Sequence, residues 1–168
     1  MSFFRNTVLV SALMLAGAAH ATDVTMADGS VSFSTPDAWV SIMETQGDPE
    51  VRVFQVPDPS PTAASSLARV TVTVKQVADG NAYQQYVSGA MGKAKALTGF
   101  QAGASQAADN FVYTAQENGA QFSYTERYWL KGSHAIQLRC VRPSQSQAGP
   151  AWKAAFDKGC DAIAARLK

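Results

Sequence analysis

The sequence predicts an α+β domain built from an antiparallel sheet and two helices. Polar and apolar residues alternate in several short runs, most clearly over 69–77, as they do in half-buried strands. Residues 81–98 and 150–167 instead carry apolar side chains at helical spacing. Two strand-like runs within 111–130 are separated by Asn118-Gly119, the strongest short-range signal of an antiparallel hairpin. Together these elements predict a single mixed domain.

The composition is that of a folded chain. Its 168 residues (17.8 kDa) are enough for one domain with a substantial core. Hydrophobic residues make up 46% and charged residues 16%, which excludes an intrinsically disordered polypeptide. The 14 Lys and Arg nearly balance the 13 Asp and Glu, for a formal net charge of +1. This balance argues against a nucleic-acid partner, because nucleic-acid-binding proteins carry a basic excess.

The first 21 residues have the pattern of a secretory signal peptide. Arg5 precedes an apolar run over 8–16, and small residues follow as far as Ala19-His20-Ala21. A membrane-spanning helix needs about 20 apolar residues, so this run is too short to be an anchor. We therefore expect a Sec signal peptide at 1–21, cleaved after Ala21. The remaining residues, 22–168, form one domain without a membrane span that is periplasmic or secreted.

The charges are unevenly distributed along the mature chain. Residues 23–79 carry a net charge of −5, and residues 80–168 carry +5. We expect the two halves to pack together so that their surface charges partly offset each other. The alternative is a dipolar surface that attracts a charged partner.

The first predicted strands are short. Residues 30–34 alternate and end before Pro36, a second apolar segment covers 39–42, and a third strand covers 51–56. Residues 57–68 contain three prolines at alternate positions. Because proline removes a backbone donor from the strand ladder, this segment is predicted to be a loop.

The strand at 69–77 leads into the first helix. Its valines point to one face and its polar residues to the other. Asn81 is the expected helix cap, and Gly99 is placed to end the helix in the left-handed conformation. One helical stripe holds Tyr83, Tyr86, Val87, Ala90, Met91, Ala94 and Leu97. We expect its two tyrosines to be core residues, the alternative being a platform for a ligand.

Two hairpins follow. In the first, a two-residue loop at 118–119 pairs Tyr113 with Tyr124 and Phe111 with Glu126.

The second hairpin is predicted to turn through a three-residue loop, 131–133. This loop length places Tyr128 opposite Ile136 on one apolar face, and Glu126 opposite Leu138 on the same face. Glu126 is then the best candidate for a carboxyl group with a perturbed pKa. We expect it instead at the rim of the sheet, with its carboxylate in water.

The two cysteines are predicted to form a disulfide bond. Cys140 has the same strand parity as Ile136 and Leu138, and Cys160 lies on the apolar face of helix 150–167. Both side chains therefore point into one interface between sheet and helix, and export places them in an oxidising compartment. A redox-active pair is the alternative, but the chain has no C-x-x-C motif.

The sequence contains no recognisable catalytic or metal-binding motif. His134 is the only histidine after the predicted signal peptide, and neither G-x-S-x-G nor H-E-x-x-H occurs. With both cysteines in a disulfide, the ligands that zinc needs are lacking, and the carboxylates are too sparse for a calcium loop. We therefore expect no enzyme activity, no metal and no cofactor.

The remaining candidates are surface residues. Loops 57–68 and 142–149 are long for connections within a domain, and such loops are often functional. They contribute Asp58 and Arg142 to the candidate partner-binding residues. Arg127 and Trp129 complete the set, since Arg and aromatic residues are favoured at binding surfaces. If helices cover both faces of the sheet, these two residues face the core instead. Depending on which face of the sheet is covered, either Trp129 or Phe122 is the aromatic residue left exposed.

The order of elements resembles that of the PsbP-like group, which includes the DcrB-like bacterial envelope proteins. The resemblance rests on residues 31–39, Val-Ser-Phe-Ser-Thr-Pro-Asp-Ala-Trp, where such proteins run from a strand into a Pro-x-x-Trp or Pro-x-Trp turn. Helix 81–98, hairpin 111–130 and helix 150–167 follow in the same order. The resemblance implies an α-β-α sandwich and a non-catalytic binding or assembly role, in some relatives as a chaperone of a secretion system. No catalytic residues carry over, and the cysteine pair is not part of the pattern.

These observations predict an exported domain that binds another protein. The leading expectation is an immunity protein that neutralises a toxin, or a secretion-accessory protein. The alternative is a module that binds a small molecule or lipid in a pocket between helix 81–98 and the sheet.

Overall fold

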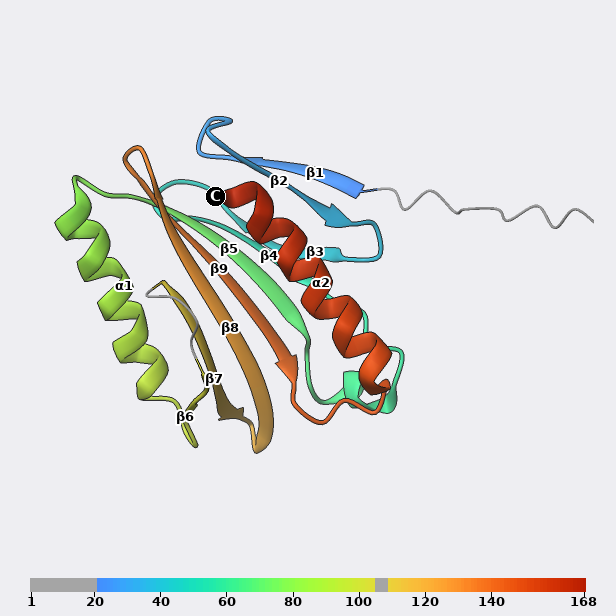
Figure 1. Ribbon diagram of the computed structural model, residues 1–168. Coiled ribbons are helices and arrows are strands. Elements are labelled where there is room, and N and C mark those ends of the chain that lie inside the picture. The colour runs from blue at the N-terminus through green and yellow to red at the C-terminus, as the bar shows by residue number, and fades with distance from the viewer. Residues whose placement is uncertain (1–20, 105–108) are drawn as a thin grey trace, which may run out of the picture.

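The seven strands of the main sheet are all antiparallel to their neighbours (Figure 1). The computed structural model describes residues 21–104 and 109–168. In spatial order the strands are β3 (Val40–Thr45), β4 (Glu50–Gln55), β5 (Arg69–Gln76), β9 (His134–Pro143), β8 (Ala120–Lys131), β7 (Asn110–Glu117) and β6 (Gln101–Ala102). The predicted signal peptide lies outside the described residues except for Ala21, the first residue of β1.

Two helices cover opposite faces of this sheet (Figure 1). Helix α1 (Gly80–Lys95) packs against one face, and α2 (Gly149–Leu167) packs against the other. A separate hairpin, β1 (Ala21–Met26) and β2 (Val31–Pro36), lies beside α2 on the second face. This arrangement confirms the predicted α+β fold with helices on both sides of the sheet.

The main core lies beneath α2. Its sheet side consists of Val70, Val72 and Val74 of β5 with alternate residues of β9, and the valines face inward as predicted. Its helix side consists of Phe156, Cys160, Ile163, Ala164 and Leu167.

The Pro-x-x-Trp turn also contributes to this core. Trp39 lies flat against α2, stacked on Phe156 with ring centroids 6.2 Å apart. Gly159 makes this contact possible, because a Cβ there would lie 2.5 Å from Cζ2 of Trp39. The motif that carries the family resemblance therefore attaches the turn after β2 to the last helix.

The stripe predicted for α1 is confirmed as core, with Tyr83, Val87 and Ala94 buried. The predicted cap at Asn81 is wrong: Asp79 is the N-cap, and its Oδ1 accepts a hydrogen bond of 2.8 Å from the Ala82 amide. The two residues are close enough in sequence that either fits the capping pattern. The helix ends at Lys95, three residues earlier than expected.

The first hairpin has the predicted register. Tyr113 lies opposite Tyr124 and Phe111 lies opposite Glu126. Asn118 and Gly119 both have positive φ angles, 49° and 81°, as a two-residue turn of this kind requires.

The second hairpin corrects the prediction. Lys131 pairs with His134, so the loop has two residues rather than three. Tyr128 therefore lies opposite Gln137 rather than Ile136. The prediction assumed one apolar face, but β9 has buried residues on both faces, such as Ile136 beneath α2 and Val141 beneath α1, so side-chain parity does not select a single loop length.

The expected position of Glu126 is also wrong. It lies opposite Arg139 rather than Leu138, on the face that α1 covers. Its side chain is fully buried instead of reaching water at the rim. Phe122 is likewise buried, with the Arg69 guanidinium 5.9 Å from its ring centroid, so it is not an exposed aromatic.

Two strands, β1 and β6, were not predicted.

The predicted loop 57–68 contains a short 3-10 helix, η1 (Pro61–Ala64). It is joined to the other long loop, because the Gln147 amide donates to Oγ1 of Thr62 over 3.1 Å.

We predict that Gly159→Ala lowers the free energy of unfolding by about 1–3 kcal/mol, because the added methyl group overlaps the ring of Trp39. Gly92→Ala in α1 is the matched control. It has open space around its Cβ position and should stabilise the protein by about 0.5–1 kcal/mol through helix propensity. Urea unfolding of both variants measures the difference. Equal midpoints would show that Trp39 is not held against Gly159.

Candidate functional site

A groove runs between α2 and the half of the sheet that α2 leaves uncovered. Its volume is about 430 Å³. Strands β7, β8 and β9 form the floor, and α2 forms one wall. The lining side chains include Asn110, Val112, Thr114, Ser123, Thr125, Arg127, Cys140, Arg142, Asp157, Cys160 and Asp161.

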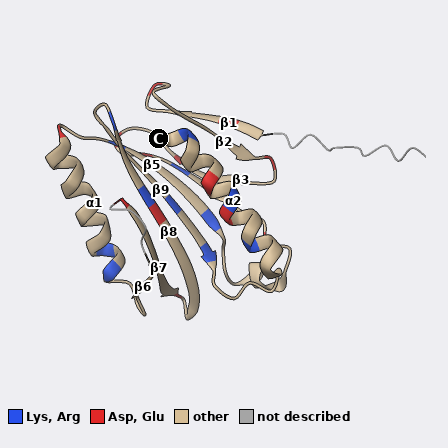
Figure 2. Cartoon of the chain, in the orientation of Figure 1, with Lys and Arg blue, Asp and Glu red and all other residues tan. Residues whose placement is uncertain are grey.

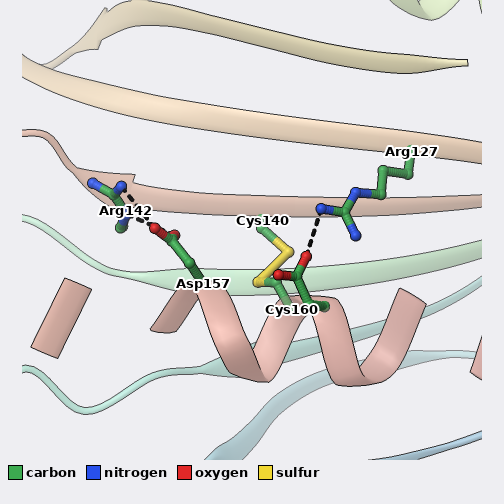
Figure 3. The surroundings of a disulfide bond; sticks show 6 residues. Arg127, Cys140, Arg142, Asp157 and Cys160 are labelled. Carbon is green, nitrogen blue, oxygen red and sulfur yellow. Dashed lines mark hydrogen bonds and ion pairs between the residues drawn. A yellow bond between two sulfur atoms is a disulfide. The ribbon is translucent and has the colours of Figure 1, made fainter. Parts of the chain in front are cut away.

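Three links attach α2 to the sheet along this groove (Figure 3). The predicted disulfide bond joins Cys140 of β9 to Cys160 of α2, with the two Cα atoms 6.4 Å apart. On one side of it Arg127 donates to Asp161 over 2.6 Å.

On the other side Arg142 donates to both carboxylate oxygens of Asp157, over 3.0 and 3.2 Å. Asp157 and Asp161 are four residues apart, so they lie on the same side of the helix. Both carboxylates are more than half exposed, whereas the two arginines are mostly buried. A partner in the groove therefore meets carboxylate oxygens at the wall.

The floor of the groove is mainly polar. Alternate side chains of β7 and β8 point into it, including the hydroxyl groups of Thr114, Ser123 and Thr125. The described residues that line it include no histidine and no free cysteine. They offer hydroxyl groups, carboxylates and guanidinium groups for hydrogen bonds and ion pairs.

The two long loops meet at one end of α2. Asp58 accepts hydrogen bonds of 2.6 Å from the Ser146 hydroxyl and 2.6 Å from the Ser60 hydroxyl. Burial opposes the charged form of Asp58, but the hydrogen bonds from Ser146 and Ser60 outweigh it and lower the pKa of Asp58 below its usual value. Trp152 donates to the Pro57 carbonyl over 2.8 Å, which ties the loop to the start of α2.

The structure brings together two of the four predicted partner-binding residues. Arg127 and Arg142 both lie in the groove wall. Trp129 is partly buried against the core beneath α2, and Asp58 lies in the loop junction. The groove itself could not be predicted from the sequence. In the sequence Asp157 and Asp161 are indistinguishable from ordinary residues on the polar face of a helix.

A second polar cluster lies beneath α1, around Glu126. Its carboxylate accepts hydrogen bonds from four side chains: the hydroxyls of Tyr113 and Tyr128, and, at 2.8 Å each, the Gln137 amide and Nε of Arg139. Burial, together with the negative charge of Glu126, raises the pKa of both tyrosines well above the usual value of 10.

Burial disfavours the charge of Arg139, but the negative charge of Glu126 raises the pKa of Arg139 above its usual value. A hydrogen bond of 3.0 Å from the Tyr86 hydroxyl to Gln137 connects the cluster to α1. All four donors converge on one carboxylate, so the cluster holds α1, β7, β8 and β9 in register.

Two further pockets bear on the alternatives. One, of about 240 Å³, lies between the end of α1 and strands β6 and β7, where a small-molecule site was expected. It is smaller than the roughly 300–1,000 Å³ of most ligand sites.

The other pocket, of about 680 Å³, lies beside His134 and contains Asp48 and Glu50. Both carboxylates already accept backbone hydrogen bonds, from Gln76 and Ala27 respectively. Across the described part of the chain, no group of three or more His, Cys, Asp or Glu side chains is arranged to hold a metal ion.

Charged residues of both signs lie on the sheet and along α2 (Figure 2). Among residues 21–104 and 109–168, the ion pair between Arg69 and Glu117, at 2.5 Å, is the one that joins the acidic and basic halves of the chain. Burial raises the pKa of Glu117, but hydrogen bonds from Arg69 and Tyr124 outweigh it and lower that pKa. The offset expected between the halves therefore rests mainly on their packing rather than on paired charges.

Two solved structures are similar to this chain. The Ran-binding protein Mog1p of Saccharomyces cerevisiae superposes with a TM-score of 0.55 at 13% identity, over 89% of this chain and 95% of that one. The chain shares its fold with Mog1p. LpqN, which is involved in cell envelope biogenesis of Mycobacterium tuberculosis, has a TM-score of 0.51 at 13% identity, over 89% of this chain and 83% of that one.

The TM-scores show a shared fold. The comparisons do not test the DcrB-like assignment, which stays a prediction. The sequence matches no known family model, and no curated protein matches it. Among the described residues, neither helix is long and apolar enough to span a bilayer.

We predict that reducing the disulfide bond lowers the free energy of unfolding by about 3 kcal/mol, since it closes a ring of 21 residues. Chemical unfolding with and without reductant measures the loss. The Cys140→Ser/Cys160→Ser double variant should match the reduced protein and be insensitive to reductant. An unchanged midpoint on reduction would contradict the prediction.

We predict that Glu126→Ala lowers the free energy of unfolding by about 3–5 kcal/mol, because it leaves Arg139 and two tyrosine hydroxyls without their acceptor. Glu44→Ala is the control. It removes an ion pair of 3.0 Å with Arg52 in which Glu44 is half exposed, and should cost less than about 1 kcal/mol. Similar losses in thermal unfolding of the two variants would show that the buried cluster is not the stronger constraint.

Proposed function

We propose that this protein is an exported, non-catalytic domain that binds another protein through the groove beside α2. The observation that carries the proposal is the groove's construction. A disulfide bond and two ion pairs hold its α2 wall to the sheet, its floor offers hydroxyl groups, and the wall offers exposed carboxylates. A rigid polar surface of this kind suits a polypeptide segment, because little conformational freedom is lost when it binds.

Export is supported by two features of the chain. The sequence begins with the pattern of a signal peptide, and the structure joins its only two cysteines in a disulfide bond. Disulfide bonds persist in oxidising compartments and are rare in the cytosol. Both features support a periplasmic or secreted location.

The comparisons are compatible with a binding role. One protein of the same fold binds Ran, and another is involved in cell envelope biogenesis. Within this class we favour a protein that neutralises a toxin or serves a secretion system, because small exported domains with a disulfide bond commonly do so. Binding of a small molecule or lipid is the second candidate, and the pocket of about 240 Å³ between α1 and the sheet is the place for it, although it is smaller than most ligand sites.

Affinity capture from the periplasmic extract of the native host tests the proposal. The wild-type chain should retain a specific protein. Thr114→Trp fills the groove from β7, on a strand that carries neither the disulfide bond nor either ion pair, and it should reduce retention at least about tenfold by steric exclusion. Thr98→Trp, in the exposed turn after α1, is the matched control and should bind like wild type.

Native mass spectrometry of the purified protein separates the two candidates. A bound metabolite or lipid, with capture of nonspecific proteins only, would overturn the protein-binding proposal. Equal capture by the wild type and the Thr114→Trp variant would place the binding surface outside the groove.

A further inference from the structure

A second hollow beside α2 is apolar, unlike the groove. It has a volume of about 430 Å³, within the range of ligand sites. One side of it is α2, which contributes Trp152, Ala155, Phe156, Lys158, Gly159 and Ala162. The other side is the turn after β2, which includes Trp39, and the start of the loop after β4, which includes Pro57. This apolar pocket shares only Phe156 with the groove, so the two are separate surfaces.

Three aromatic rings line the apolar pocket, and their positions are fixed. Trp39 and Trp152 each contact Phe156, with ring centroids 6.2 and 5.9 Å away. Trp39 lies directly against Gly159, and the indole N–H of Trp152 donates to the Pro57 carbonyl over 2.8 Å. Because the rings are already held in place, a ligand that contacts them orders few side chains when it binds.

The apolar pocket offers few partners for hydrogen bonds. Apart from two indole N–H groups and the Lys158 ammonium, the side chains of the described residues that line it contain no polar atom. One of these indole groups, that of Trp152, is already bonded to Pro57. Sugars and nucleotides carry many polar groups, and burying those groups without new partners is unfavourable. The part of a ligand that enters this pocket is therefore apolar.

Lys158 supplies the one charge among the described residues of the lining. It is exposed and makes no hydrogen bond or ion pair with the residues that the structure describes. Two aspartates adjoin lining residues in sequence, but Asp37 accepts from Thr22 and Asp58 accepts from Ser146. The aspartates of α2 line the groove, where each is paired with an arginine. The unpaired ammonium therefore favours an anionic group beside an apolar body.

The apolar pocket is elongated along α2. Its lining runs from Trp152 to Ala162, which is about 15 Å at the rise of an α-helix. The small residues Ala155 and Gly159 keep the helix surface low between the rings. A volume of about 430 Å³ over this length leaves a mean cross-section of about 30 Å². Such a shape suits one extended hydrocarbon chain better than a fused ring system.

We propose that the apolar pocket binds a single-chain amphiphile, a molecule with one hydrocarbon chain and an anionic head group. The chain packs against the three aromatic rings and the small residues of α2, and the head group lies beside the Lys158 ammonium. A free fatty acid and an anionic lysophospholipid share this chemistry. The inference does not rest on the proposed function, because the pocket lies outside the groove.

Isothermal titration calorimetry with decanoate, below the concentration at which it forms micelles, tests the proposal. We expect a dissociation constant of about 30–300 µM, given the small size of the ligand. Decanol and decyltrimethylammonium carry the same chain without the negative charge. Both should bind at least about threefold more weakly than decanoate, because an exposed ion pair contributes modestly. A lysophosphatidylglycerol with a ten-carbon chain is the fourth probe, and its affinity relative to decanoate distinguishes a membrane lipid from a free fatty acid.

Two pairs of variants locate the site. Ala155→Trp fills the pocket and should weaken decanoate binding at least about tenfold, whereas Ala154→Trp, at the adjacent exposed position outside the pocket, should bind like wild type. Lys158→Glu should weaken decanoate binding at least about fivefold and leave decanol binding unchanged. Lys131→Glu makes the same charge change at an exposed position at the end of β8 and should have no effect. Circular dichroism checks that all four variants fold.

Three outcomes would overturn the proposal. The first is a wild type that binds neither decanoate nor the lysophospholipid at about 1 mM. The second is decanol or decyltrimethylammonium binding as tightly as decanoate, since Lys158 would then not select the ligand. The third is unchanged decanoate binding by Ala155→Trp, which would place the amphiphile elsewhere. If no amphiphile binds but Ala155→Trp abolishes capture of a protein, the pocket holds a side chain of that protein, and the proposal fails in the same way.

Discussion

The turn at Gly132-Ser133 is the constraint on which the rest of the structure depends. Because side chains alternate along a strand, the register of β8 against β9 decides which residues α1 and α2 each cover. With a two-residue loop, Cys140 points toward α2 and can reach Cys160. Arg139, its neighbour, points the other way and meets Glu126. A shift of one residue in β9 would break the disulfide bond and the buried cluster together.

The two faces of the sheet use different kinds of attachment. On the face of α1, a buried carboxylate collects four hydrogen bonds, and its position is set by directional contacts. On the face of α2, a covalent bond and two ion pairs supplement an extensive apolar core. The second arrangement leaves a polar groove with fixed walls, which is why the groove rather than the buried cluster is the candidate for binding.

The sequence by itself determined the features that depend on local rules. The alternation over 69–77 showed which valines face inward, Asn118-Gly119 set the register of the first hairpin, and the apolar stripes showed which sides of the helices are buried. The strand parity of Cys140 and the position of Cys160 on the apolar face of the last helix were enough to predict the disulfide bond between them.

Only the tertiary structure decided the rest. Both faces of β9 carry buried residues, so the pattern of apolar residues does not distinguish a two-residue loop from a three-residue one, and the position predicted for Glu126 was wrong for the same reason. The groove joins residues from three strands and a helix that are distant in sequence, and each looks like an ordinary surface residue in its own segment. Long-range contacts of this kind arise only when the packing of α2 fixes which aspartate meets which arginine.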